Sequence, residues 1–301
     1  MRRTRLIAGL GIVAALALTG CASGSPTDGA KEPATDGSST SSTPWEVATD
    51  VSLTGSPTYD AMVKRGGVIV GVKEDQPGLG YLDVTTQERT GFDVDTARWI
   101  AASLGFDEDQ IEFKAIASVN REQSIKNGDI DYYVGTYSIN DKRKQDIDFA
   151  GPYFETGQGL LVAQDADEVT KIEELEGKTV CSATGSTPIQ NIKANFPGIK
   201  TQEYDLYSAC VEDLINGQVD AVTTDQAILI GYAAQYPDDI KVTGGLFTQE
   251  LYGVGLPKGD DALRSWINTV LTDGGDVWKA IFDNNLGSSG IVVDQPKVDA
   301  Y

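Results

Sequence analysis

The stretch Val68-Ile69-Val70-Gly71-Val72 decides the fold, because it is a short apolar run of the kind that forms a buried strand. A helical pattern follows at 93–104 with its apolar residues on one face, and a second strand is expected at 111–113. A short helix at 121–126 and a strand at 132–134 continue the alternation. Strands that alternate with helices predict a mostly parallel sheet flanked by helices.

The same alternation begins again at Thr179-Val180-Cys181. The remaining patterns predict strands at 201–204 and 221–223, and helices from Pro188 and over 207–216, 226–235, 262–271 and 277–286. Two separate runs of strands and helices predict two α/β lobes rather than one.

The composition excludes several classes of function. Among 301 residues there are 45 Asp and Glu, 24 Lys and Arg and no histidine, which gives a formal charge of −21. Without histidine the chain cannot hold a Ser-His-Asp triad, a Cys-His pair or the usual His-bearing zinc sites. The acidic balance argues against binding to nucleic acid or to an anionic membrane surface. An anionic ligand would therefore need a local basic pocket.

The N-terminus predicts export. Basic residues precede an apolar stretch at 6–18, which is too short to span a bilayer but suits a secretory signal. It ends in Leu18-Thr19-Gly20-Cys21, which resembles the bacterial lipobox. That resemblance implies a lipoprotein signal peptide over 1–20 and a lipid such as palmitate on Cys21. The alternative is an ordinary signal peptide with a chance cysteine. The rest of the stretch 21–57 is rich in Ser, Thr, Gly, Pro and Asp and has too little apolar content to fold, which predicts a disordered tether.

If Cys21 carries lipid, two cysteines remain in an oxidising compartment. Cys181 and Cys210 would then form one disulfide that closes a loop of 30 residues, counted from 181 to 210. The alternative is two separate buried thiols.

Candidate binding residues follow the predicted strands, where ligands of open α/β sheets are held. Lys73 follows the first strand, Arg121 lies in Ser118-Val119-Asn120-Arg121, and Arg143 comes shortly after Gly135-Thr136-Tyr137-Ser138. Taken one at a time, each of these cations has an ordinary interpretation as a solvated surface charge.

The second half offers two more candidates. Thr184-Gly185-Ser186-Thr187 precedes Pro188, so it begins a helix whose free N–H groups could hold an anion, although a simple cap explains it equally well. Asp225 follows a strand and could bind a cation or cap the next helix.

Three motifs in order resemble one family, the extracellular solute-binding proteins of polar amino-acid ABC transporters, family 3. They are Gly91-Phe92-Asp93-Val94-Asp95, the segment 140–153 (NDKRKQDIDFAGPY) and the segment 217–225 (GQVDAVTTD). The chain departs from the first motif at Thr96, where a larger hydrophobe is usual. The lipobox, the loop 75–80 and the cysteine pair are similar to the actinobacterial glutamate-binding branch.

The resemblance implies a role for each candidate. Arg143 would grip the ligand α-carboxylate, with N–H and hydroxyl donors from Thr136 and Ser138, and Asp225 would take the α-ammonium group. The second lobe would contribute four residues: Thr184, Gly185, Ser186 and Thr187.

Two further cations carry the prediction of specificity. Residues at the positions of Lys73 and Arg121 reach the side-chain carboxylate in binders of acidic amino acids. A neutral ligand would leave these charges poorly compensated in a dry cleft, which is costly. We therefore expect glutamate or aspartate to be preferred over glutamine.

The fold implied is the two-lobe periplasmic-binding-protein fold of type II, with two mostly parallel sheets. Lobe 1 is expected over 58–153 plus 253–290, lobe 2 over 158–249, and a tail over 291–301. Two crossing strands near 154–157 and 249–253 would form a hinge that closes on the ligand.

The function implied is capture of an acidic amino acid and its delivery to the membrane permease of an ABC transporter. We expect a monomer held to the membrane by lipid alone, on the outer face of the cytoplasmic membrane, with no cofactor, metal or nucleic acid. A sensor that presents the amino acid to a membrane receptor would have the same cleft. An exported enzyme on this scaffold is the third class, and the lack of histidine argues against it.

Overall fold

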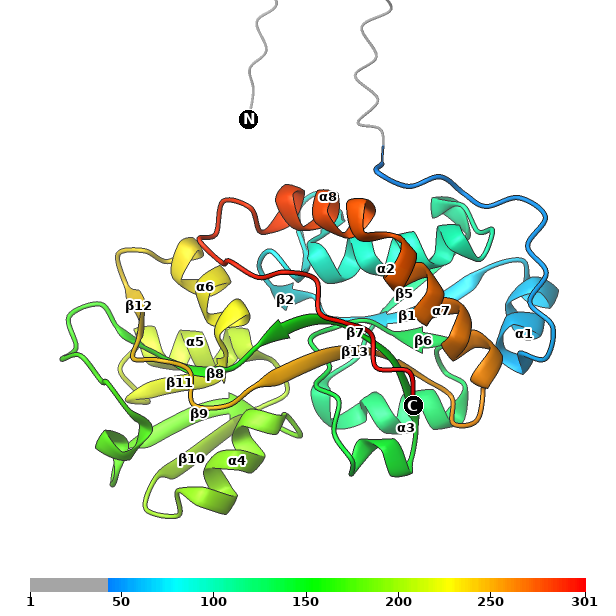
Figure 1. Ribbon diagram of the computed structural model, residues 1–301. Coiled ribbons are helices and arrows are strands. Elements are labelled where there is room, and N and C mark those ends of the chain that lie inside the picture. The colour runs from blue at the N-terminus through cyan, green and yellow to red at the C-terminus, as the bar shows by residue number, and fades with distance from the viewer. Residues whose placement is uncertain (1–42) are drawn as a thin grey trace, which may run out of the picture. The chain divides into compact units, whose positions relative to one another are not determined.

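The computed structural model describes residues 43–301. The predicted signal peptide, the lipobox with Cys21 and most of the predicted tether lie outside these residues. Within the described part of the chain, no helix is both long and apolar enough to cross a membrane. The described residues are arranged around two five-stranded sheets (Figure 1).

Lobe 1 is built on a sheet of order β5-β1-β6-β13-β7. Its strands are β1 (Val68–Val72), β5 (Ile111–Ala115), β6 (Tyr132–Tyr133), β7 (Asp148–Thr156) and β13 (Glu250–Leu256). Its helices are α1 (Pro57–Arg65), α2 (Phe92–Ser103), α3 (Arg121–Asn127), α7 (Asp261–Asp273) and α8 (Gly275–Asn285). The expected strand at β1 and the helices near α2, α3, α7 and α8 are confirmed.

Lobe 2 repeats this plan with the order β10-β9-β11-β8-β12. Its strands are β8 (Gln158–Ala163), β9 (Thr179–Ala183), β10 (Lys200–Tyr204), β11 (Ala221–Asp225) and β12 (Ile240–Thr243). Its helices are α4 (Thr187–Asn195), α5 (Tyr207–Ile215) and α6 (Gln226–Gln235). In each sheet four of five strands run in one direction, and the reversed strand is β13 in lobe 1 and β8 in lobe 2. The predicted mostly parallel sheets are therefore confirmed.

Two neighbouring segments connect the lobes (Figure 1). One is Gly157, between β7 and β8, and the other is the loop from β12 to β13. They touch, because the N–H of Gln158 donates to the Thr248 hydroxyl at 2.9 Å and a Cβ on Gly157 would lie 2.2 Å from the Thr248 carbonyl oxygen. This pair of connections supplies the geometry that a hinge needs.

A small sheet in lobe 1 reaches toward lobe 2. It consists of β2 (Asp75–Gln76), β3 (Gly80–Leu82) and β4 (Arg89–Thr90), with all neighbours antiparallel. Four short 3-10 helices complete the elements: η1 (Glu108–Gln110), η2 (Ser118–Asn120), η3 (Arg143–Gln145) and η4 (Ile172–Leu175). Two of them, η2 and η3, carry or adjoin candidate site residues.

Part of the predicted tether packs against lobe 1. Trp45, Val51 and Leu53 pack against the apolar core, and the N–H of Ala48 donates to the Ala102 carbonyl at 2.9 Å. Apolar side chains spaced through a polar segment hold it against α2. The described residues of the predicted tether, up to Leu53 at least, therefore lie on lobe 1.

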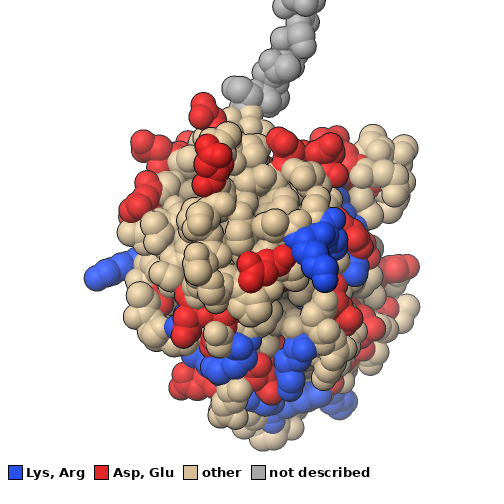
Figure 2. Space-filling view, turned by 90° about the vertical axis from the view of Figure 1, so that its right-hand side faces the viewer, with Lys and Arg blue, Asp and Glu red and all other residues tan. Residues whose placement is uncertain are grey.

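The surface carries the acidic excess. On the face shown in Figure 2, acidic side chains are spread around the rim, while basic side chains form a few groups among them. This face has mixed charge. The candidate cations Lys73, Arg121 and Arg143, in contrast, are buried inside the molecule.

Candidate functional site

Three basic side chains are buried at the ends of lobe 1 strands and in the loops that follow them. Lys73 comes directly after β1, Arg121 begins α3 and Arg143 begins η3. Their exposed fractions are 3%, 2% and 4%, respectively. The ordinary interpretation of each as a solvated surface charge is therefore wrong, because all three are removed from water.

Lys73 has a polar but uncharged partner. Its Nζ donates to the Ser118 hydroxyl at 2.8 Å. Burial, followed by repulsion from Arg121, lowers the pKa of Lys73 to about 7. The ammonium thus lies in a site that favours its neutral form unless an anion arrives.

Arg121 is held by carbonyls and an aromatic ring. Its Nε donates to the Ser118 carbonyl at 3.1 Å and its Nη1 to the Thr136 carbonyl at 3.3 Å. The guanidinium carbon lies 4.2 Å from the centre of the Tyr137 ring. A cation–π contact of this kind keeps the charge without neutralising it.

Arg143 joins the two lobes. In lobe 1 its Nε pairs with Glu122 at 3.0 Å and its Nη1 donates to the Ser138 carbonyl at 2.6 Å. In lobe 2 the same Nη1 donates to the Thr187 hydroxyl at 3.1 Å and Nη2 to the Gly185 carbonyl at 3.2 Å. Burial, and then the charge of Arg121, lower the pKa of Arg143. These contacts use four of the five guanidinium N–H groups, so a carboxylate that binds through two of them would have to displace one of these partners.

Two of the three cations lack an acidic partner among the described residues. Glu122 is the acidic partner of Arg143, but over residues 43–301 no carboxylate oxygen lies within 4.0 Å of the Lys73 or Arg121 nitrogens. Two buried positive charges without an ion pair are expensive unless something else supplies the negative charge.

Asp225 is the buried carboxylate of lobe 2. It ends β11 and is 3% exposed. Its Oδ2 accepts from the Tyr252 hydroxyl at 2.7 Å, while its Oδ1 has no partner among the described residues. Burial, and then the charge of Glu250, raise the pKa of Asp225 to about 7, whereas Arg121 and Arg143 act in the opposite direction.

The capping explanation of Asp225 is wrong. Asp225 occupies the N-cap position of α6, yet within the described structure its side chain accepts no hydrogen bond from the helix. Its carboxylate is directed instead to Tyr252 of lobe 1. A buried, half-partnered carboxylate is suited to a cationic group of a ligand.

The expected donor role of Thr136 requires correction. Its N–H donates to Asp93 Oδ2 at 2.9 Å and its hydroxyl to Gln76 Oε1 at 3.1 Å. Both donors are used because the buried Asp93 carboxylate and the Gln76 amide need partners. Ser138 lies beside Arg143, buried at 4% exposure, and offers its carbonyl to the Arg143 guanidinium.

The lobe 2 loop is shaped mainly by its own contacts. Thr184 donates through both N–H and hydroxyl to the Tyr204 carbonyl, at 2.8 and 3.2 Å. Ser186 caps α4 by accepting from the Ile189 N–H at 3.3 Å, so the cap interpretation holds for this residue. Gly185 and Thr187 are the members of the loop that reach Arg143.

Four residues around the cluster are missing from the sequence-based prediction. Glu122 pairs with Arg143, Tyr137 lies against two guanidinium groups, and Tyr252 binds Asp225. The fourth, Gln76, is fully buried with an unpartnered Nε2 among the described residues. Tyr137 could have been found, since it separates the two predicted residues Thr136 and Ser138.

A cavity of about 280 Å³ opens beside this cluster, and both lobes contribute to it. Its lining residues are Ser118, Val119, Glu122, Asn140, Lys142, Arg143, Asp146, Gly185 and Gln190. No group of three or more potential metal ligands occurs in residues 43–301. The chemistry available is recognition by charge and hydrogen bonding.

Comparison with known proteins identifies the family. The sequence pattern of the bacterial extracellular solute-binding proteins, family 3, matches residues 68–275. The chain belongs to this family. Its two lobes form the two-lobe fold of periplasmic binding proteins, and a solute-binding protein is not an enzyme.

Relatives from bacteria are similar over most of the chain. Glutamate-binding protein GluB of Corynebacterium glutamicum is 41% identical over 255 residues, 80% of this chain and 85% of the relative. Glutamine-binding protein of Geobacillus stearothermophilus is 37% identical over 254 residues, 83% of this chain and 90% of the relative.

Solved structures agree with the fold. An ancestral arginine-binding protein bound to glutamine matches with a TM-score of 0.70 and 33% identity, covering 74% of this chain and 99% of that one. The cysteine-binding protein of Campylobacter jejuni matches with a TM-score of 0.74 and 26% identity, covering 80% and 98%.

Proposed function

We propose that this solute-binding protein captures an acidic amino acid between its lobes and delivers it to the permease of an ABC transporter. The observation that carries the proposal is the pair of buried cations, Lys73 and Arg121, that lack an acidic partner among residues 43–301. Relatives named for glutamate and glutamine support an amino-acid ligand of this size.

The amino-acid backbone would bind at Arg143 and Asp225. The Arg143 guanidinium would hold the α-carboxylate, with Ser138 and the lobe 2 residues Gly185 and Thr187 around it. The unpartnered Oδ1 of Asp225 would accept from the α-ammonium group. Thr136 and Ser186, whose polar groups are already used, would form walls of the same site, together with Thr184.

The side-chain carboxylate would bind at Lys73 and Arg121. An incoming negative charge would restore the ordinary protonated state of Lys73, whose pKa is about 7 without it. A neutral amide could not compensate both cations, so we expect glutamate or aspartate to be preferred. Loss of one desolvated charge contact costs about 2–5 kcal/mol, against about −8 kcal/mol for micromolar binding.

Closure of the two lobes would deliver the ligand in a form that the permease recognises. The lobes would be 58–153 with 253–290, and 158–249, and they would move about Gly157 and the β12–β13 loop. A lipid on Cys21 would anchor the protein to the outer face of the cytoplasmic membrane, in keeping with an extracellular family. The protein would act as a monomer.

Isothermal titration calorimetry tests the proposal. The soluble protein that begins after Cys21 is titrated with each of the twenty amino acids. We expect saturable binding of glutamate or aspartate and weaker binding of glutamine. Preference for a neutral or basic amino acid would refute the roles of Lys73 and Arg121.

Variants assign the two ends of the ligand. Arg143→Ala should abolish binding of every amino acid, and Lys73→Ala or Arg121→Ala should weaken glutamate much more than glutamine. Lys64→Ala is the matched control, because it removes an exposed cation of α1 that does not line the cavity and should change neither affinity. Equal losses for glutamate and glutamine in the Lys73 variant would contradict the proposed specificity.

A further inference from the structure

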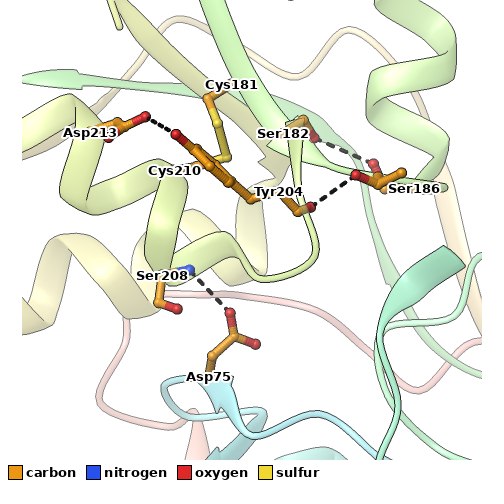
Figure 3. The surroundings of a disulfide bond; sticks show 9 residues. Asp75, Cys181, Ser182, Ser186, Tyr204, Ser208, Cys210 and Asp213 are labelled. Carbon is orange, nitrogen blue, oxygen red and sulfur yellow. Dashed lines mark hydrogen bonds between the residues drawn. A yellow bond between two sulfur atoms is a disulfide. The ribbon is translucent and has the colours of Figure 1, made fainter. Parts of the chain in front are cut away.

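The segment that supplies Lys73 also contacts lobe 2 directly. Two residues after Lys73, the Asp75 Oδ2 accepts from the backbone N–H of Ser208 at 3.1 Å (Figure 3). Tyr232 donates its hydroxyl to the Asp75 carbonyl and lies 3.2 Å from the same carboxylate oxygen. Asp75 lies in β2, Ser208 in α5 and Tyr232 in α6, so the contact joins lobe 1 to two helices of lobe 2. We call these three residues the interlobe cap.

The interlobe cap supplies a hydrogen-bond acceptor for the start of α5, where lobe 2 has no capping side chain. The first N–H groups of a helix have no partner within it, and a polar side chain at the N-cap usually accepts from one of them. The N-cap residue of α5 is Leu206, which offers no such side chain. Asp75 from the other lobe accepts in its place, and a carboxylate at this end also complements the helix dipole.

The approach of the two lobes here is close enough to exclude side chains. A Cβ on Gly231, in α6, would lie 2.3 Å from the Pro77 carbonyl oxygen in the turn after β2. Such a distance requires glycine on one side of the contact. Asp75 itself is only 9% exposed, so its carboxylate is largely removed from water.

A disulfide connects the interlobe cap to the ligand loop. Cys210 of α5 is bonded to Cys181 of β9, as Figure 3 shows. Strand β9 ends at Ala183 and leads into Thr184–Thr187 of the proposed site. Ser208 and the ligand loop therefore belong to one covalently braced part of lobe 2.

We propose that Asp75 is a positioning residue that stabilises the closed form through the interlobe cap and so raises ligand affinity without touching the ligand. The proposal rests on closure of the two lobes as described for the proposed function. Opening would expose both Asp75 and the start of α5 to water, so the cap favours only the closed form. A ligand that binds the closed form gains apparent affinity as that form becomes more populated.

Whether removal of the Asp75 charge weakens or strengthens ligand binding distinguishes a role in closure from a direct electrostatic effect on the ligand. The negative charge of Asp75 acts to raise the pKa of Lys73. Among the described residues, however, no Asp75 carboxylate oxygen lies within 4.0 Å of the Lys73 ammonium. Removal of this negative charge should, through charge alone, strengthen the binding of an anion. If Asp75 stabilises the closed form, its removal should weaken binding.

The test compares Asp75→Asn with a matched control in the same small sheet. Asp83 lies just after β3 and accepts two backbone N–H groups, from Thr85 and Thr86 at 2.7 and 3.0 Å, inside lobe 1. Calorimetry with any amino acid that saturates the native protein should show affinity reduced about 10-fold, or roughly 1.4 kcal/mol, for Asp75→Asn and unchanged for Asp83→Asn.

Small-angle X-ray scattering of the two variants, with and without ligand, measures closure itself. We expect Asp75→Asn to need a higher ligand concentration than the native protein for half of its contraction, with the same radius of gyration at saturation, and Tyr232→Phe should show a smaller change in the same direction while keeping the packing. Unchanged or tighter binding by Asp75→Asn, or contraction at the same ligand concentration as in the native protein, would overturn the proposal. Since any saturating amino acid serves, a wrong assignment of the acidic ligand leaves this test intact.

Discussion

At the scale of single residues, the buried charges of Lys73 and Asp225 should lower the stability of the ligand-free protein and favour a ligand of opposite charges. Burial makes Lys73 and Asp225 unfavourable in their charged forms, and the pKa of each is shifted to about 7, downward for the lysine and upward for the aspartate. A ligand with a carboxylate and an ammonium group would restore both charges. The same groups that bind the ligand should therefore destabilise the ligand-free protein.

Asp225→Asn tests this destabilisation. In the native state the pKa of Asp225 is about 7, above its ordinary value of 3.8. Between pH 4 and 7 the native state therefore holds a proton on Asp225 that the unfolded state has lost. The stability of the native protein should thus fall as pH rises from 4 to 7. The variant should be more stable by about 1–3 kcal/mol at pH 8, since the full shift corresponds to at most about 4 kcal/mol, and less so at pH 5.

Urea denaturation of the ligand-free protein at both pH values measures the difference, and calorimetry should show that the variant has lost its ligand. Asp165→Asn is the control, because Asp165 is exposed and its removal should change neither quantity. If the variant is less stable than the native protein at pH 8, then burial does not destabilise the charged form of Asp225 as proposed.

Some of the buried side chains of the candidate site could be predicted from the sequence, and others could not. The structure places Lys73, Arg121 and Arg143 after strands of lobe 1, where the carboxyl ends of parallel strands meet at one edge, and their role in binding stays a prediction. The pairing of Arg143 with Glu122 was not predictable, since Glu122 is one acid in a charged helix. The two are brought together by the path of the chain from α3 through β6 to η3, which no local pattern specifies.

At the scale of elements, patterns predicted the helices other than α1 and the strands β1, β5, β6, β9, β10 and β11, whereas the strands that join the lobes were expected only from the family resemblance. Strand β7 contains Gly151-Pro152, which is typical of a turn, and β13 contains two glycines. The expected crossing strands at 154–157 and 249–253 cover only parts of both. Strands β2 and β4 have two residues each, too few to show any period. Their positions depend on pairing with distant partners.

The disulfide between β9 and α5 should protect both cysteines from thiol reagents and stabilise the fold. Both cysteines are fully buried and bonded to each other, as the cysteine count indicated. Cys181 and Cys210 should resist thiol reagents until the protein is reduced and unfolded. A Cys181→Ser, Cys210→Ser double variant should lose about 3–4 kcal/mol of unfolding free energy, because the closed loop of 30 residues is released.

Guanidinium denaturation with and without reductant measures this loss, and the double variant serves as its own control because reductant should not affect it. Reaction of either thiol in the native, non-reduced protein would contradict the bond.

At the scale of the whole molecule, closure depends on how near the lobes can approach. Figure 1 shows the lobes joined by β7–β8 and β12–β13, whereas the interlobe cap lies on other elements, β2, α5 and α6. At the ligand loop, a Cβ on Gly185 would lie 2.7 Å from Val119 Cα in lobe 1. That atom belongs to backbone, so it cannot move aside as the end of a side chain could.

Gly185→Ala should therefore block full closure while lobe 2 still folds. The residue has a φ of +75°, so the variant also incurs the cost of a left-handed alanine, about 1–2 kcal/mol. Gly217→Ala separates the two effects, because Gly217 has a φ of +68° and a Cβ there would have nothing within 4 Å. Both variants should lose similar stability in urea, but only Gly185→Ala should lose ligand affinity, by about 10-fold or more, and fail to contract in X-ray scattering when ligand is added. Equal affinities for the two variants would mean that the ligand binds without the approach of Gly185 to Val119, and closure would then have to be completed elsewhere on the lobe interface.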